Sequence, residues 1–254
     1  MLKQINIKYI YHSCYQVSID DKILIFDYFH GDLDDLDPYK KDITFFASHS
    51  HPDHYNKDIL SLKGNENIRY ILSNDIQDLS KVDNIIYLGD TEEKVEDRKL
   101  MYSKNIEYMK PYDLKEYPDM TVRTFGSTDK GVSFLVSVNS INIFHAGDLN
   151  LWIWDEDTEE EREQMRKDFL KELDRIKHYD IDIAFFPLDP RLKKLYSEGF
   201  KEFIDRVQPT LIFPMHFRDN ISYNLSFMNE FPEYKGIYRP VFKKNQIFLV
   251  NYEI

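Results

Sequence analysis

Four side chains of the kinds that bind metal ions lie within six residues in the first quarter of the chain. The stretch FFASHSHPDHYN, residues 45–56, contains His49, His51, Asp53 and His54, although the whole chain has only eight histidines. Imidazole nitrogens and carboxylate oxygens suit zinc, iron, manganese or nickel. An exposed polar loop rarely has this density of ligands directly after an apolar run, so the stretch predicts a metal site.

The spacing of these ligands makes two metal centres possible. In an extended segment the side chains alternate, and His49, His51 and Asp53 would share one face. His54 would then point the other way.

Further ligands are expected at the ends of other strands. Asp148 follows an apolar run in INIFHAGDLN, and His216 ends the run TLIFPMH. Strands of α/β sheets deliver polar residues into a common crevice at their ends. Considered separately, Asp148 would be interpreted as a turn residue, and His216 as a hydrogen-bonded histidine of the core. Together with the cluster they predict one shared site.

Short apolar or alternating runs predict strands in both halves of the chain, with helices between them. Thr158 and Glu161 form a capping-box pattern that predicts the start of a helix over 158–178, and 199–208 predicts another. The pattern indicates an α/β protein with layered sheets. Residues 90–118 are polar and show no clear periodicity. The strands are expected at 5–13, 15–19, 22–27, 42–48, 69–73, 84–89, 120–126, 132–138, 141–148, 182–188, 210–216 and 246–252.

Composition narrows the class of protein. A length of 254 residues without linkers or repeats suggests a single domain, 1–254. The formal net charge of -12 opposes long-range attraction to nucleic acid, and no run is long enough for a membrane span. One cysteine, Cys14, permits no internal disulfide, and the N-terminus lacks a signal-peptide apolar region. We therefore expect a cytoplasmic protein.

The order of these motifs resembles the metallo-β-lactamase superfamily. HSHPDH matches its HxHxDH signature, and the AGD and PMH segments follow in the order of its bridging aspartate and final histidine. The chain looks most similar to the general metal-dependent hydrolase branch, which includes ascorbate-phosphate lactonase-like and N-acyl-phosphatidylethanolamine phospholipase-like members. The resemblance implies a four-layer αββα sandwich of two mixed β-sheets flanked by helices.

The resemblance also implies roles for the motif residues. His49 and His51 would hold a first metal ion, while Asp53, His54 and His216 would hold a second. Asp148 would bridge two divalent ions, most often Zn²⁺, with Mn²⁺ or Fe as alternatives. A shared hydroxide would be the nucleophile, and Asp53 would orient it or handle its proton.

One expected ligand is missing. The family usually supplies a third histidine to the first metal from the region that here contains GSTDKG. Asp129 is the favoured replacement because a carboxylate is a better ligand than the Thr128 hydroxyl. His145 is a further alternative, but its odd spacing from Asp148 places it on the opposite face of a straight strand. A carboxylate in this position would favour iron or manganese.

Other side chains suggest supporting roles. In the resembling branch the element with His12 lies beside the metals, so His12 is a candidate for catalysis or substrate contact, or is a strand-end histidine bonded to backbone. Asp27 could fix the tautomer of a ligating histidine. Trp152 and Trp154 either line a pocket or pack in the core. Arg191 and Arg218 either contact an anionic substrate or form surface ion pairs.

These features predict a metal-dependent hydrolase, dinuclear, that cleaves an ester, lactone or phosphodiester in a small-molecule substrate. The first alternative is a non-catalytic metal-binding or sensor protein with a degenerate first metal site. The second is a nuclease of the same fold, against which the acidic charge argues. The substrate and the oligomeric state are left open by the sequence.

Overall fold

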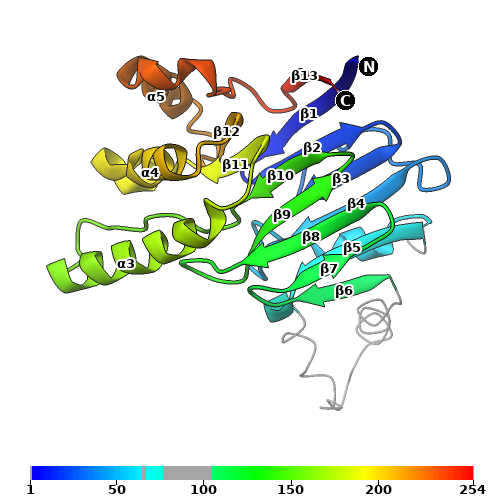
Figure 1. The fold of residues 1–254 in the computed structure, drawn as a ribbon, viewed down its shortest axis with the longest axis horizontal. Helices are drawn as coiled ribbons and strands as arrows, with labels where there is room; N and C mark the ends of the chain where they lie inside the picture. Colours follow the sequence, from blue (N-terminus) through cyan, green and yellow to red (C-terminus); the bar gives the residue numbers. More distant parts are fainter. Residues whose placement is uncertain (1, 65–66, 77–104, 254) are drawn as a thin grey trace, which may run out of the picture.

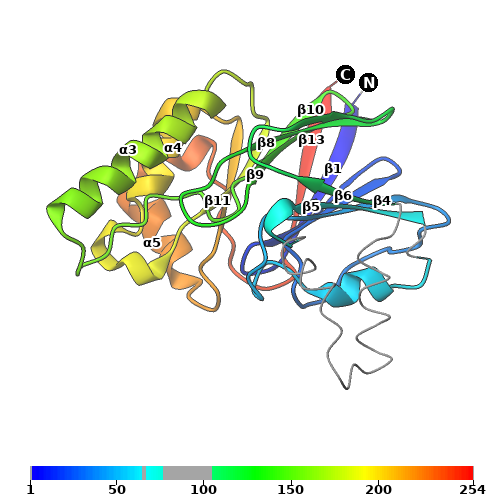
Figure 2. The same ribbon diagram turned by 90° about the horizontal axis from the view of Figure 1, so that it is seen from below.

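The computed structural model describes residues 2–64, 67–76 and 105–253. Two β-sheets stack face to face, and helices cover the outer side of one of them (Figure 1, Figure 2). The first sheet has the order β13 (Ile247–Glu253), β1 (Leu2–Tyr11), β2 (Cys14–Ile19), β3 (Lys22–Phe26), β4 (Asp42–Ala47), β5 (Ile68–Ser73) and β6 (Ile106–Met109). The second has the order β12 (Leu211–Met215), β11 (Ile183–Pro187), β10 (Ile141–His145), β9 (Ser133–Val138), β8 (Met120–Phe125) and β7 (Leu114–Glu116).

Both sheets are mixed. β3, β4, β5 and β6 are parallel to one another, as are β10, β11 and β12, whereas the remaining neighbours are antiparallel. The predicted fold class, a layered α/β sandwich of two mixed sheets, is therefore confirmed.

The helical layer consists of α3 (Glu159–Ile176), α4 (Glu198–Val207) and α5 (Ser222–Glu230), which lie against the second sheet (Figure 2). The predicted capping box is present: the Thr158 side chain accepts from the Glu161 backbone, and Glu161 accepts from Thr158. Short 3₁₀ helices connect the larger elements, namely η1 (Lys57–Ser61), η4 (Pro190–Leu195) and η5 (Pro232–Gly236). Asn56 is the N-cap of η1, and its side chain accepts from the backbone nitrogen of Asp58.

Strand alternation divides the core between two faces of the first sheet. Leu24 and Phe26 of β3 face the second sheet within the main core, while Ile23 and Ile25 pack on the outer side with Ile59 of η1. Cys14 is buried and unpaired, as expected.

Eleven of the expected strands are present, and the twelfth, at 84–89, lies outside the described residues. The structure adds β6 and β7, which the polar stretch 90–118 did not indicate. Both are short strands at the edges of their sheets, and most of their side chains are partly exposed. Little of either strand is buried, so the sequence had no strong apolar periodicity to reveal them.

The direction of the strands determines where the site lies. β1 is antiparallel to β2, which is antiparallel to β3, so β1, β3 and β4 run the same way. In the second sheet β10, β11 and β12 also run together. The carboxyl ends of these two sets of strands bring their following loops to one edge of the sandwich.

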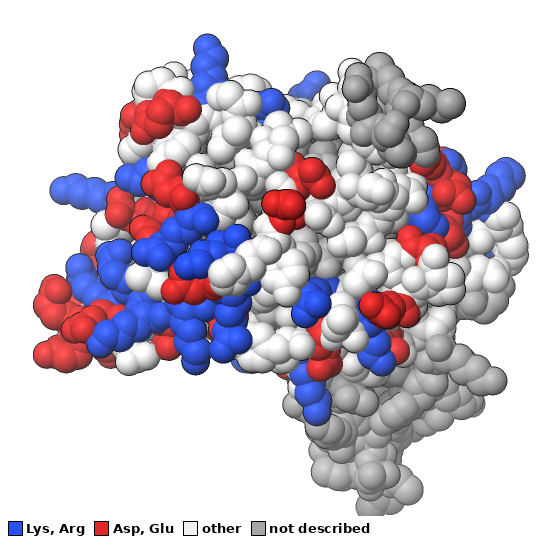
Figure 3. Space-filling view, in the orientation of Figure 1, with Lys and Arg blue, Asp and Glu red and all other residues white. Residues whose placement is uncertain are grey.

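Charge is unevenly distributed over the surface. On the face seen in Figure 3, lysine and arginine side chains gather over the helical side, mixed with aspartate and glutamate. The overall charge of -12 therefore does not describe every face of the molecule. Among the helices of the described ranges, none combines the length and apolar character required to cross a bilayer.

Candidate metal centre

A polar side chain follows each of six strands at this edge, within three residues of the strand end. Asp148 is the central one, because its carboxylate faces three imidazoles. Its Oδ1 atom lies 3.2 Å from Nε2 of His54 and 3.2 Å from Nε2 of His216, and its Oδ2 atom lies 3.5 Å from Nε2 of His49. The six residues are His12 after β1, Asp27 after β3, His49 after β4, Asp148 after β10, Asp189 after β11 and His216 after β12.

The ligand-rich segment after β4 turns sharply rather than remaining extended. The backbone nitrogens of His54 and Tyr55 both donate to the carbonyl of His51, at 3.0 Å each. This turn brings the ring of His54 within 4.1 Å of the ring of His49, measured between centroids. The expectation that His54 points away from the other ligands is therefore wrong. Extended alternation does not hold where i to i+3 and i to i+4 hydrogen bonds curl the chain.

Potential ligand atoms form three overlapping groups. Within each group the ligand atoms lie within 4.8 Å of one another. The groups are His12, Asp53, His54 and His216; His49, His54 and Asp148; and His51, Asp129 and Asp148. The structure thus brings together all seven residues expected to bind metal, and adds His12. Their role as ligands stays a prediction.

The three alternatives for the missing histidine are placed differently. Asp129 lies near His51, with 3.9 Å between its Oδ2 and Nδ1 of His51, and both side chains are well exposed, at 46% and 37%. Thr128 instead donates its hydroxyl to the carbonyl of Asn150 at 2.6 Å. His145 is buried between the sheets, with Nε2 2.9 Å from the carbonyl of Ser13 and Nδ1 accepting from the Gly147 backbone. Of the three, only Asp129 faces the cluster with unused ligand atoms.

Hydrogen bonds behind the cluster fix the orientation of three imidazoles. Nδ1 of His54 donates to Asp27 at 2.7 Å, and Nδ1 of His216 donates to Asp189 at 2.7 Å. The hydroxyl of Ser48 donates to Asp27 at 2.7 Å, so its oxygen accepts from Nδ1 of His49 at 3.0 Å. A neutral imidazole that donates through Nδ1 keeps a lone pair on Nε2. When neutral, as metal binding requires, all three imidazoles present the lone pair of Nε2 toward Asp148.

The positioning role expected for Asp27 is matched by this geometry. Asp189 was missed, although it follows an apolar run in the same way as Asp148 and His216. Asp189 comes two residues after β11, at the end of the run IAFFPLD. The same signal, a polar residue that follows an apolar run, could have identified it.

Burial and neighbouring charge shift the ionisation of the cluster. Burial lowers the pKa values of His12 and His49 to about 4, so both are neutral at pH 7. Burial would also lower the pKa of His216, but the carboxylates of Asp148 and Asp189 raise it to about 9. Burial would raise the pKa of Asp148, yet the surrounding imidazoles hold it well below its usual value.

Several buried atoms of the cluster have no hydrogen-bond partner. They are both ring nitrogens of His12, Nε2 of His54 and Oδ1 of Asp148. Leaving a buried polar atom unpaired costs about 1–3 kcal/mol, and native proteins rarely tolerate several together. The contacts of 3.2–3.5 Å between these atoms are close approaches of imidazole and carboxylate that are not hydrogen bonds. Imidazole and carboxylate donors arranged in this way fit divalent metal ions.

The cluster opens into a pocket of about 340 Å³. Asp53, Asp148 and His216 line it on the side of the cluster, and Trp152 and Trp154 form part of its wall. The two indole rings are stacked, with 6.1 Å between centroids, and Nε1 of Trp152 donates to the backbone carbonyl of Asp148 at 2.8 Å. The tryptophans therefore line the site instead of packing only in the core.

Both arginines considered as anion contacts form ion pairs at this pocket. Arg191 bonds Asp189 and lies over Trp152 and Trp154, with its guanidinium carbon 5.7 and 5.6 Å from the ring centroids. Arg218 donates to Oδ2 of Asp53 at 2.8 Å. Each side chain keeps more than half of its surface exposed; Arg191 lines the pocket, and Arg218 pairs with Asp53, which lines it.

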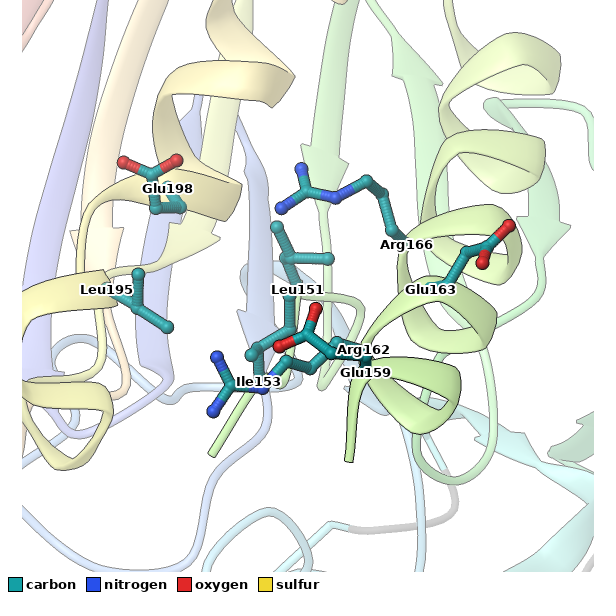
Figure 4. Close-up of a pocket in the computed structure, with 8 residues that line it drawn as sticks. All are labelled: Leu151, Ile153, Glu159, Arg162, Glu163, Arg166, Leu195 and Glu198. Carbon is teal, nitrogen blue, oxygen red and sulfur yellow. The ribbon is translucent and has the colours of Figure 1, made fainter. Parts of the chain in front are cut away.

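A second pocket, of about 390 Å³, lies between α3 and α4 (Figure 4). Leu151 and Ile153 form its floor, and Arg166 points into it from α3. These floor residues alternate with Trp152 and Trp154, so the loop segment 151–154 contributes side chains to both pockets. The second pocket contains none of the clustered histidines, and the chemistry therefore belongs to the first.

Solved structures share this fold over nearly the whole chain. A metallo hydrolase from Ignicoccus hospitalis has a TM-score of 0.63 at 15% identity, with 99% of each chain covered. An isothiocyanate hydrolase from Delia radicum gut bacteria has a TM-score of 0.57 at 12% identity, with 97% of this chain and 100% of that chain covered. CmlA, a diiron β-hydroxylase from Streptomyces venezuelae, has a TM-score of 0.58 at 10% identity, with 98% of this chain and 54% of that chain covered. At these identities the likeness is one of fold.

No curated protein matches the sequence. The family described as the β-lactamase superfamily domain matches residues 6–216, which include every strand end of the metal centre. This match covers most of the sequence and shows that the chain belongs to the family described as the β-lactamase superfamily domain.

Proposed function

We propose that the protein is a metal-dependent hydrolase of small-molecule esters, lactones or phosphodiesters. The observation that supports this most directly is the Asp148 carboxylate, which faces three oriented imidazoles at the base of an open pocket. The solved structures of similar fold that are described as hydrolases are compatible with the proposal.

Two divalent ions would be held by the clustered side chains. His49, His51 and Asp129 would hold one ion, Asp53, His54 and His216 would hold the other, and Asp148 would contact both. When bound, such ions lower the pKa of a coordinated water from ~15.7 toward ~7 and stabilise negative charge on the substrate. The carboxylate of Asp129 suits Mn²⁺ or Fe as well as Zn²⁺.

Asp53 would orient the attacking water and accept a hydrogen bond from it. The nearby imidazole of His12 keeps the pKa of Asp53 well below its usual range, so this carboxylate is ionised at neutral pH. Arg218 holds the same carboxylate at 2.8 Å and restricts its rotation. A fixed carboxylate aligns the water before attack, and so lowers the activation barrier more than a freely rotating carboxylate would.

The pocket wall would position the rest of the substrate. Trp152 and Trp154 present apolar surface beside the reacting group, and Arg191 and Arg218 place positive charge at its rim. A substrate with an apolar portion next to an anionic or polarised carbonyl or phosphoryl group fits this lining.

The proposal is tested by metal analysis combined with turnover. The protein would be loaded separately with Zn²⁺, Mn²⁺ and Fe²⁺ and assayed on a panel of esters, lactones and phosphodiesters. We expect Asp53→Ala to lower kcat/KM by about 10²-fold or more. Asp21→Ala, an exposed aspartate in the β2–β3 turn, is the control and should keep full activity. Absence of metal after purification from metal-replete medium would refute the proposal.

The exposure of His51 and Asp129 supports a second candidate, a metal-binding protein without turnover. His51 and Asp129 are 3.9 Å apart and well exposed, unlike the buried ligands around Asp148. A chain that binds metal tightly but turns over no member of the panel under any loading would favour this candidate.

A further inference from the structure

His12 is the most conspicuous unpaired side chain among the described residues of the site. It is 1% exposed, and neither Nδ1 nor Nε2 has a hydrogen-bond partner. A buried imidazole normally uses at least one ring nitrogen in a hydrogen bond. His145, which is equally buried, uses both. The two unpaired ring nitrogens of His12 therefore distinguish it from His145 and point to a ligand role.

The backbone holds His12 firmly in this position. Its nitrogen donates to the hydroxyl of Tyr9 at 2.9 Å, and its carbonyl accepts from the backbone nitrogen of His216 at 3.0 Å. His12 and His216 both have left-handed backbone angles, with φ of 56° and 68°. Such conformations are unfavourable for residues other than glycine and are concentrated at functional sites. The loop after β1 and the loop after β12 are thus joined directly at two candidate ligands.

The ring of His12 lies among candidate metal ligands, with the ring of Phe29 also in contact. Its Nε2 lies 3.3 Å from Oδ2 of Asp53, and its ring centroid lies 4.1 Å from that of His216 and 5.5 Å from that of His54. These four residues form the largest of the three ligand groups, with ligand atoms all within 4.8 Å. The ring of His12 therefore faces the same space as three expected ligands of one ion.

We propose that His12 is a direct ligand of the metal ion held by Asp53, His54 and His216, which makes this site richer in protein ligands than the other. The proposal rests on the proposed function, because it requires that metal binds to this cluster. It extends the ligand set beyond the seven residues that the motifs indicate.

Unequal filling of the two sites follows from this assignment. The site with His12 has four protein ligands besides Asp148, and three of them are nearly fully buried. The other site depends on His51 and Asp129, which are well exposed. The site with His12 should fill first as metal is added.

The first experiment compares metal affinity in His12→Gln and the natural chain, by competition with a chromophoric chelator for Zn²⁺ and Co²⁺. We expect the tighter of the two binding steps to weaken at least about tenfold, since loss of even an indirect partner of a metal ligand has that effect. The visible spectrum of the first equivalent of Co²⁺ should also change. His30→Gln is the control, because His30 is an exposed histidine near Tyr11 that belongs to none of the three groups. An unchanged tighter step and spectrum in a folded His12→Gln protein would overturn the proposal.

A second measurement uses the natural chain and so does not depend on the variant folding. In nitrogen-labelled protein loaded with a spin-active cadmium isotope, each ligating imidazole shows a scalar coupling to the metal. We expect five coupled histidines, His12 with His49, His51, His54 and His216, among the eight in the chain. Coupling that is present for His54 and His216 but absent for His12 would refute the ligand role and leave the proposed function intact. Absence of any bound metal would refute both.

Discussion

The Oδ2 atom of Asp27 lies 2.7 Å from Nδ1 of His54, and both side chains are fully buried. Asp27 also accepts from the backbone nitrogen and the hydroxyl of Ser48, both at 2.7 Å, and so ties the end of β3 to the loop that carries the ligands. We expect Asp27→Asn to weaken metal binding by about 10- to 100-fold, because the neutral amide no longer polarises His54.

Competition titration with a chelator would measure this change. Asp21→Asn is the matched control, since it makes the same substitution at an exposed position on the turn before β3. Equal affinities for Asp27→Asn and the control would show that Asp27 does not influence the metal.

Removal of metal should lower thermal stability. The unpaired nitrogens of His12 and His54 and the Oδ1 atom of Asp148 would regain partners only when an ion is bound. At a free metal concentration of 100 times Kd, binding stabilises the folded chain by about 2.7 kcal/mol. For a chain of this size that corresponds to a Tm increase of about 5–10 °C. Differential scanning calorimetry with and without chelator would test it, and identical Tm values would argue against a metal centre.

Gly131 supports the ligand loop from the opposite sheet. It has φ of +70°, and a Cβ at this position would overlap the carbonyl oxygen of Ser48 and lie 2.6 Å from Cβ of His49. We expect Gly131→Ala to reduce the free energy of unfolding by about 1–3 kcal/mol and to displace His49. Urea denaturation would measure the first effect and metal titration the second. Gly236→Ala, where no atom lies within 4 Å of the new Cβ, should change stability by less than about 0.5 kcal/mol.

Trp152 links the pocket wall to the backbone of Asp148. Trp152→Phe keeps an aromatic ring but removes the indole donor that bonds the Asp148 carbonyl at 2.8 Å. We expect a loss of about 1–2 kcal/mol in unfolding free energy and a higher KM. Trp154→Phe makes the same change in a half-buried ring and should cost less stability. A larger loss of stability in Trp154→Phe would show that the hydrogen bond is not the stabilising contact.

A pH effect is expected at an ion-pair cluster away from the metal centre. Asp119 bonds Lys22 at 3.2 Å and Arg69 at 3.3 Å, joining the first sheet to the β7–β8 turn. Burial would raise the pKa of Asp119, but Arg69 and Lys22 lower it below its ordinary value of 3.8. Because the pKa of Asp119 is lower in the folded chain than in the unfolded chain, its contribution to stability is complete above the ordinary pKa. That contribution is lost as the pH falls through the pKa of the folded chain.

Asp119→Asn should therefore destabilise the chain by about 1 kcal/mol at pH 7, and the difference should disappear in strong acid. Chemical denaturation over a pH series would measure it. Asp42→Asn is the matched control: Asp42 also bonds Lys22, at 2.9 Å, but its side chain is 58% exposed, so a smaller effect is expected. A difference that grows on acidification would contradict the assignment.

Much of the site could be predicted because its residues follow recognisable strands. Asp148 and His216 each come directly after an apolar run, and the topology carries such strand ends to one edge. Local spacing was sufficient to single out the candidate ligands after β4. It was not sufficient to orient them, because the turn that reverses His54 depends on hydrogen bonds to the carbonyl of His51.

Contacts between distant segments explain the remaining differences. The position of Asp129 opposite His51 depends on the β8–β9 loop, in which the backbone nitrogen of Val132 donates to the carbonyl of Ser48, a residue far away in the sequence. The unpaired ring nitrogens of His12 depend on which side chains the two sheets bring around it, among them Asp53, His216 and Phe29. Neither property can be predicted from the residues next to Asp129 or His12 in the sequence.

Three of the strand-end residues, His12, Asp27 and His216, have left-handed backbone conformations that glycine adopts more easily. A change to glycine at any of them would relax the backbone and remove an imidazole or carboxylate in the same step. Selection for a more stable fold and selection for the metal centre would therefore act in opposite directions at these positions. Descendants that no longer need the chemistry should accumulate glycine there first, and that replacement pattern would distinguish them from lineages in which the site is still in use.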